Sequence, residues 1–241
     1  MTPIPDPLPH PPDDSGAGAW GSQPIYSRAD DLAFAQVAAA AVVAADSRGW
    51  THAARFLNHY LDNTGDPLDP KVDELLRDVS DADNNANRMA ATEIQQVAIR
   101  ASSAKNYDNP VQFQSQWEGY TFDQTQSPDW FFAMGSIHMS VTGVVTVNKP
   151  ADGAQPNITT EYKVWVHDRY NWDGGKSTEI AGVTVTDKRM GALHTAGLAR
   201  EYEMDGSSGA RQYAGPVPSS GPGILPAAHG SRDGGRTDPT R

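Results

Sequence analysis

The densest group of chemically active side chains lies in the stretch HDRYNWD, residues 167–173. It supplies a histidine, two carboxylates, an arginine, a phenol and an amide, which are groups that bind ions or transfer protons. Asp168 and Tyr170 are the candidate catalytic pair, because alternate residues of a strand share one face. The other members are candidate binding residues: His167, Arg169, Asn171, Trp172 and Asp173.

Packing alone also explains this stretch, and both interpretations stay open at this point. Asp168 and Asn171 would then organise a turn through backbone amides, while Tyr170 and Trp172 would cover the sheet. His194 is a further catalytic candidate, although its helix face also carries apolar residues, which is typical of a core histidine.

A metal site is possible only if the fold gathers residues that are far apart in the sequence. The zinc-like set would be His138, His167 and His194. Nothing in their spacing brings these imidazoles together, so the sequence predicts neither a metal nor another cofactor.

The stretch WDGGKST, residues 172–178, resembles a phosphate-binding loop at first sight. Such a loop needs a glycine where this chain has Tyr170, and it must lead into a helix. The following sequence alternates and is rich in β-branched residues, which predicts a strand. We therefore predict a hairpin turn around Asp173, Gly174 and Gly175, with a returning strand after it.

The periodicity predicts an α+β fold with two halves. Residues 28–105 have helical spacing and would form an N-terminal bundle, whereas residues 106–214 would form an antiparallel sheet with one packed helix. Residues 130–148 read as one bent strand or two, with a bulge at Gly143. The flanks, residues 1–27 and residues 215–241, are rich in proline or glycine and are predicted to be disordered.

Composition excludes several functions. The chain has no cysteine, so a thiolate metal site is impossible, and its 30 acidic against 19 basic residues give a net charge of −11. That excess opposes nucleic-acid binding. Residues 32–45 are too short to span a bilayer, which needs about 20 apolar residues. Because no signal peptide is recognisable, we expect a cytoplasmic protein or one exported by another route.

A resemblance to uncharacterised actinobacterial proteins is carried by HYLDNTGDPLDPKVDELLRDV, DWFFAMGSIHMSVTGVVTV and VHDRYNWDGGKSTEIAGVTVTDKRMGALHTAGLAREYEMDGSS. Similar C-terminal modules end large proteins tied to specialised secretion and bacterial competition. A partial similarity links Asp168, Arg169, Tyr170 and Asn171 to colicin M-like enzymes, which cut the lipid-linked cell-wall precursor. Asn171 replaces an acid of that pattern, and Ser177 and Thr178 stand where its His-Arg pair would fall.

These observations favour a non-catalytic, secretion-associated interaction or scaffold protein with a protein partner. The alternatives are a secreted toxin or hydrolase that uses Asp168 and Tyr170, and a metal-binding module.

The turn interpretation of WDGGKST predicts the behaviour of Lys176. Replacing Lys176 by alanine should change the free energy of unfolding by less than about 0.5 kcal/mol, as for most exposed side chains. Calorimetric titration with Mg-ATP and Mg-GTP should give no binding heat. Micromolar nucleotide binding that disappears in Lys176→Ala would show instead that the stretch is a phosphate loop.

Overall fold

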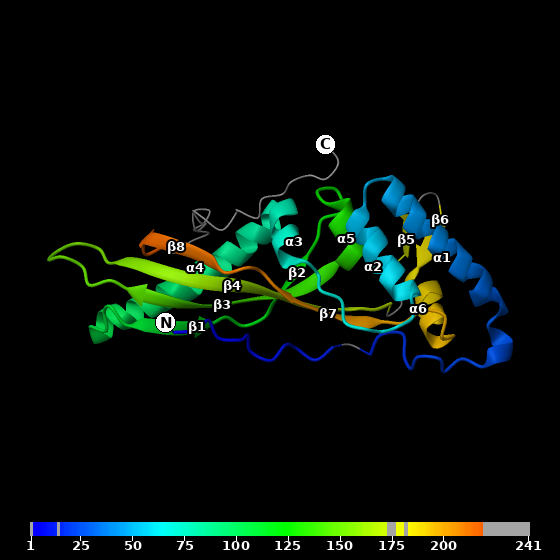
Figure 1. Ribbon diagram of the computed structural model, residues 1–241, viewed down its shortest axis with the longest axis horizontal. Coiled ribbons are helices and arrows are strands. Elements are labelled where there is room, and N and C mark those ends of the chain that lie inside the picture. Colours follow the sequence, from blue (N-terminus) through cyan, green and yellow to red (C-terminus); the bar gives the residue numbers. More distant parts are fainter. Residues whose placement is uncertain (1, 14, 173–176, 181–182, 219–241) are drawn as a thin grey trace.

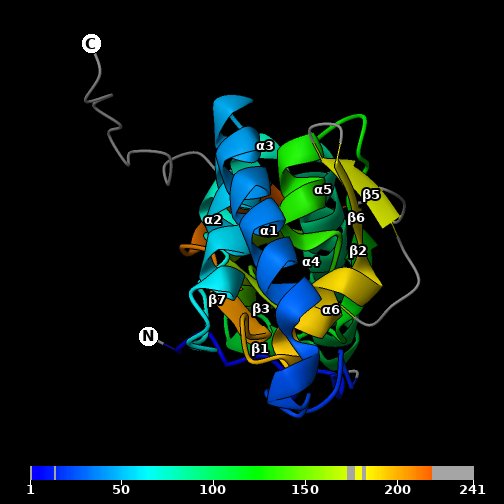
Figure 2. The same cartoon turned by 90° about the vertical axis from the view of Figure 1, so that its right-hand side faces the viewer.

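The computed structural model describes residues 2–13, 15–172, 177–180 and 183–218. The described residues have the expected α+β architecture, with helices in the N-terminal half and an antiparallel sheet after them. The molecule is elongated because the long strands run along its main axis, and most helices gather at one end (Figures 1 and 2).

The helices follow the spacing of the apolar and small residues. They are α1 (Ala29–Ser47), α2 (Thr51–Leu61), α3 (Val72–Asp78), α4 (Ser80–Ala104), α5 (Pro128–Met134) and α6 (Asp187–Thr195). α6 begins after Thr186, because the Thr186 hydroxyl accepts a hydrogen bond from the Arg189 N–H and so caps the helix. α5 corrects the strand predicted at residue 130, since Pro128 occupies its first turn and Gly135 ends it.

The main sheet is built around a hairpin of two long strands, β3 (Ser136–Val147) and β4 (Asn157–Tyr170). Two short strands pair with the outer edge of each long one. β1 (Pro110–Gln114) and β2 (Glu118–Thr121) pair with β3, while β7 (Tyr202–Ser207) and β8 (Arg211–Pro216) pair with β4. The ordered region therefore continues past residue 214, where the sequence predicted a disordered tail, and residues 219–241 lie outside the described part.

The pair of short strands on each side of the hairpin is interrupted, and at each interruption a buried serine bonds to the long strand. Between β1 and β2, the Ser115 N–H donates to the Val141 carbonyl, and the Ser115 Oγ accepts from the Val141 N–H at 2.9 Å. Between β7 and β8, Ser208 makes the same two bonds to Val164, the second at 3.0 Å. Val141 and Val164 face each other across the hairpin, so the two breaks lie on one line across the sheet.

One face of the sheet packs against the helices. The larger hydrophobic cluster takes residues from both predicted halves, among them Phe56, Leu75, Ile94, Val141, Ile158 and Met204. α4 lies against β3, and the Tyr162 hydroxyl on β4 donates to the Asn87 side chain at 2.9 Å. The predicted boundary at residue 105 therefore does not separate two cores.

The predicted bulge at Gly143 is absent from the described sheet, because pairing runs in register through this residue on both sides. A glycine is needed there for another reason. A Cβ atom on Gly143 would lie 2.6 Å from the Glu161 carbonyl oxygen and from the Phe113 ring.

The strand after the WDGGKST stretch does not return to β4. β5 (Ser177–Ile180) pairs with β6 (Val183–Thr186) in a separate two-stranded sheet. The predicted turn residues Asp173, Gly174 and Gly175 lie outside the described residues. The hairpin predicted with β4 is thus wrong in its pairing, because the alternating pattern identifies a strand but not its partner.

The two edge serines should contribute strongly to stability. Ser115→Ala and Ser208→Ala each leave a buried strand N–H without its acceptor, so each should lower the free energy of unfolding by about 1–3 kcal/mol in urea denaturation. Ser136→Ala is the matched control, since this serine lies on β3 with its side chain exposed. Equal effects of the three variants would contradict the role given to the edge serines.

Candidate functional site

The face of the sheet opposite α4 is covered by residues 2–13, which we call the N-terminal strap. The strap runs along the sheet in extended conformation (Figure 1), which corrects the predicted disorder of residues 1–27. Four of its carbonyl groups accept hydrogen bonds from sheet-side donors, at 2.7–2.8 Å: Pro3 from Gln112, Pro5 from Thr142, Asp6 from Gln114 and Leu8 from Trp117.

The chemistry of proline explains this manner of docking. The strap sequence is TPIPDPLPHPPD, in which proline removes many backbone N–H groups and holds the chain extended. Such a segment cannot join the sheet as a strand, but its carbonyls remain free to accept. The sheet meets them with side-chain amides, a hydroxyl and an indole N–H, which is the way proline-rich peptides are recognised on aromatic surfaces.

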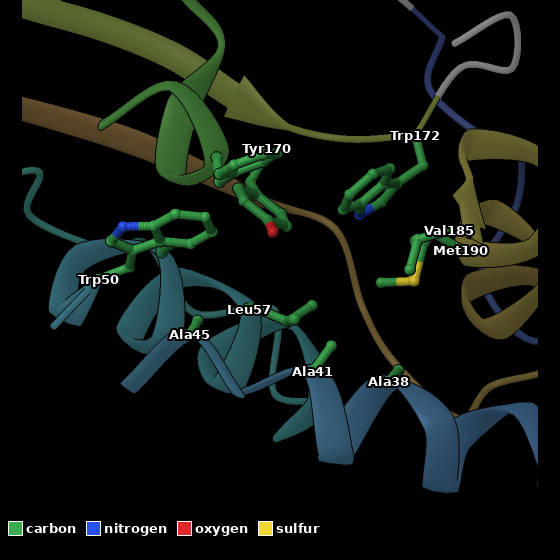
Figure 3. Close-up of a pocket in the computed structure, with 11 residues that line it drawn as sticks. Ala38, Ala41, Ala45, Trp50, Leu57, Tyr170, Trp172, Val185 and Met190 are labelled. Carbon is green, nitrogen blue, oxygen red and sulfur yellow. The ribbon is translucent and has the colours of Figure 1, made fainter. Parts of the chain in front are cut away.

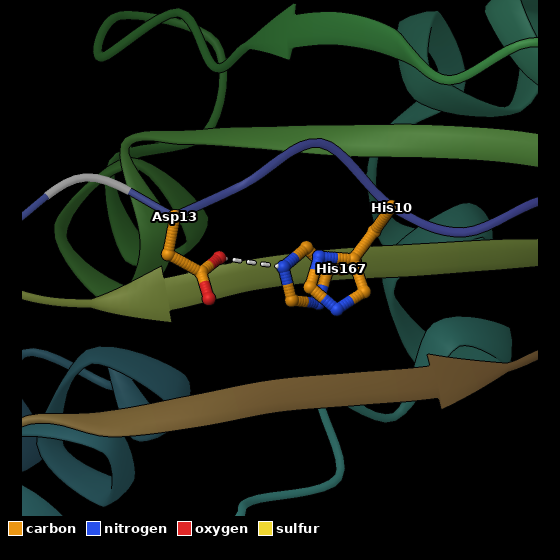
Figure 4. Close-up of side chains that lie close together, drawn as sticks. All are labelled: His10, Asp13 and His167. Carbon is orange, nitrogen blue, oxygen red and sulfur yellow. Dashed lines mark hydrogen bonds and ion pairs between the residues drawn. The ribbon is translucent and has the colours of Figure 1, made fainter.

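His167 forms the polar end of this contact. Its ring is 2 % exposed, and both ring nitrogens contact carboxylates. Nε2 lies 2.9 Å from Asp13 Oδ1 of the strap, and Nδ1 lies 2.7 Å from Asp205 Oδ1 on β7. The His10 ring stacks on His167 with 3.6 Å between centroids (Figure 4). The Trp117 ring approaches His167 edge-on.

Two opposing effects act on the pKa of His167. Burial disfavours the charged ring, but the hydrogen bonds and charges of Asp205 and Asp13 outweigh it, so the pKa of His167 is raised. Nearby, burial and then the charge of Asp13 raise the pKa of the Glu203 carboxyl. The cluster therefore favours a charged imidazolium held between two carboxylates.

Of the three histidines singled out in the sequence, the fold brings together only two. His138 is the strand partner of His167 on the same sheet face. His194 lies on α6, and both of its ring nitrogens contact backbone groups. Nε2 contacts the Gly18 carbonyl at 3.0 Å, and Nδ1 accepts a hydrogen bond from the Glu201 N–H. Among the described residues, the group with the spacing of a metal site is instead His10, Asp13 and His167.

Tyr170 is a buried residue at the end of β4. It lies under the Tyr202 ring, with 5.0 Å between centroids, and burial raises the pKa of its phenol. Asp168 pairs with Met204 on the neighbouring strand. Burial thus keeps the phenol of Tyr170 protonated at neutral pH, and the role of Asp168 and Tyr170 as a catalytic pair stays a prediction.

Arg169 and Trp172 contact a buried carboxylate that the sequence did not single out. The Glu201 side chain is fully buried, and it accepts hydrogen bonds from the N–H groups of Ala17 and Trp172 and from the Arg169 guanidinium. Asn171 joins β4 to Trp172, and its role as a binding residue stays a prediction. Glu201 therefore fastens the chain that follows the strap to the end of β4.

Tyr170 and Trp172 do line a cavity of about 40 Å³ between α1, α2 and α6 (Figure 3). Its other walls are apolar, including Ala38, Ala41 and Met190. The Trp172 indole N–H is buried and finds no hydrogen-bond partner among the described residues. The cavity has room for more than one water molecule, each of which needs about 10–15 Å³, but it offers few polar partners.

No protein family, curated protein or solved structure matches the chain. Among the residues that the structure describes, none of the helices combines the length and apolar character needed to cross a bilayer. The proposals below therefore depend on the geometry of the chain itself.

The His167 cluster predicts a measurable titration. Because the folded pKa is raised above the unfolded value of about 6.5, the bridge stabilises the fold fully below about pH 6.5 and loses its effect as pH rises through the folded pKa. NMR titration of the ring protons in EDTA should show this raised pKa, and Asp13→Asn should lower it.

Asp6→Asn is the control, because it removes the same charge from the strap without touching His167. A His167 ring that titrates at or below about 6.5 in the unaltered protein would contradict the bridged geometry.

Proposed function

We propose that this chain is a non-catalytic interaction protein whose strap-covered sheet face binds an extended, proline-rich segment of a protein partner. The observation that carries the proposal is the seated strap. Its backbone carbonyls meet four sheet-side donors, and a single acidic side chain meets His167. In this structure the chain's own residues 2–13 cover this sheet face.

The contacts also define the ligand that this sheet face prefers. Because the donors form hydrogen bonds to carbonyl oxygens, they select an extended backbone rather than particular side chains. His167 adds selectivity for a carboxylate about five residues after the carbonyl that meets Trp117, as Asp13 follows Leu8 in the strap. The preferred partner segment is therefore proline-rich and carries an acidic residue near its C-terminal end.

The energies suit a reversible interaction. A neutral hydrogen bond contributes about 0.5–1.5 kcal/mol net, and a bond to a charged group about 1.5–3 kcal/mol. Proline-rich segments are already extended, so little further entropy is lost on docking. Since the tethered strap competes at an effective concentration in the millimolar range, a partner segment must bind more tightly than a free copy of the strap.

The association with secretion that the resemblance implies stays a prediction. The proposal concerns only the class of interaction and the surface that performs it.

The direct test is to bind the strap in trans. A chain that begins at residue 15 should bind a labelled peptide of residues 2–13 with one site and a micromolar Kd, measured by fluorescence anisotropy. The full chain should bind the same peptide at least tenfold more weakly, because its own strap covers the same sheet face. Trp117→Phe in the shortened chain should weaken binding about fivefold, which corresponds to one lost hydrogen bond of about 1 kcal/mol.

Trp20→Phe provides the matched control, since Trp20 also donates from its indole but to Asn63, away from the strap. A peptide with glycine in place of Pro5, Pro7 and Pro9 should bind more weakly because it loses its preformed shape. Absence of binding at 1 mM peptide (about the weakest affinity that would matter), with circular dichroism showing a folded protein, would refute the proposal.

A further inference from the structure

Three metal-binding side chains converge where the strap ends. His10, Asp13 and His167 each offer one ligand atom, and these atoms lie within 4.8 Å of one another. Two of the residues come from the strap, three positions apart, while His167 comes from β4 (Figure 4). The strap residues are exposed and the β4 residue is buried, so the group is open to solvent on one side.

The neighbours of these residues are arranged as in a metal site. Asp205 Oδ1 contacts His167 Nδ1 at 2.7 Å, which leaves Nε2 directed at the strap. The Pro11 carbonyl contacts His10 Nδ1 at 2.8 Å, which likewise leaves Nε2 of that ring as the available nitrogen. Metal-bound histidines almost always hold a carboxylate or carbonyl at the second nitrogen, because this contact fixes the ring and raises its basicity.

We propose that His10, Asp13 and His167 form a Zn²⁺ site that joins the strap to β4. Two imidazoles and one carboxylate are ligands that zinc prefers, and three protein ligands with solvent at the fourth position are typical of open zinc sites. Mg²⁺ and Ca²⁺ prefer sites built from oxygen ligands, so they fit this group poorly.

Binding of zinc needs two adjustments, a small shift of Asp13 and a rotation of the exposed His10 side chain. Zinc bonds of about 2.0–2.1 Å at tetrahedral angles place ligand atoms roughly 3.3 Å apart. His167 Nε2 and Asp13 Oδ1 are 2.9 Å apart, so Asp13 must move by a few tenths of an ångström. His10 must turn out of its stack on His167, which its exposure permits. Zinc then takes the place of the proton on His167 Nε2, which passes to solvent.

The site does not depend on the proposed function. It requires only that the strap lies on the sheet as observed, whether or not a partner competes with the strap for this sheet face. Zinc binding by a protein that fails to bind the peptide would therefore support the zinc site and refute the proposed function. Peptide binding by a protein that binds no zinc would refute the zinc site alone.

The test uses the full chain, purified without a tag and stripped with EDTA. Isothermal titration with ZnCl₂ should show one ion per chain with micromolar or tighter affinity, and bound zinc should be confirmed by mass spectrometry of the metal. His10→Gln and Asp13→Asn should each weaken binding at least tenfold. Asp205→Asn should weaken it about 10–100-fold, the range known for outer partners of metal ligands.

Asp6→Asn is the matched control, since it changes the strap's charge equally but lies outside the group, and it should bind zinc as the unaltered chain does. Both strap variants alter exposed residues, so folding is checked by circular dichroism. Co²⁺ should give the visible absorption of a tetrahedral site. No zinc binding, or binding that is unchanged in both His10→Gln and Asp13→Asn, would overturn the proposal.

Discussion

The pairing of two long strands, β3 and β4, is the interaction on which the rest of the structure depends. Every other strand of the main sheet attaches to this hairpin, and each flank is interrupted at the level of Val141 and Val164. Ser115 and Ser208 supply the backbone partners that the interruptions remove. The hairpin can therefore run unbroken beyond its short neighbours, with one face for the helices and the other for the strap.

The two faces are stabilised by different physics. The face toward α4 is apolar and excludes water, whereas the face toward the strap uses hydrogen bonds from side chains to carbonyl groups. Two polar clusters hold the N-terminal chain in place, one at His167 and one at Glu201. Both join early residues of the chain to β4, so the N-terminal flank that the sequence predicted to be disordered is part of the fold.

The sequence predicted what depends on local periodicity. The helices within residues 29–104 and strand β3, which lies within the predicted residues 130–148, follow from spacing and side-chain type. The order of the strap was missed because proline-rich composition reports only the absence of an apolar core, while its stability comes from distant donors such as Trp117. Of this cluster, the sequence identified His167 as a candidate binding residue. Its partners Asp13 and Asp205 were not identified, because they are remote from it in the sequence.

The strap also has a consequence for the order of events during synthesis. Its residues leave the ribosome before those of the sheet, yet the hydrogen bonds that hold it reach residues 108 to 154 positions later in the chain. Contacts of such long range form late, because the loop between them must be closed first. The nascent chain thus presents a complete sheet face and an undocked proline-rich segment at the same time, which is the interval in which exchange of straps between neighbouring copies is most favourable.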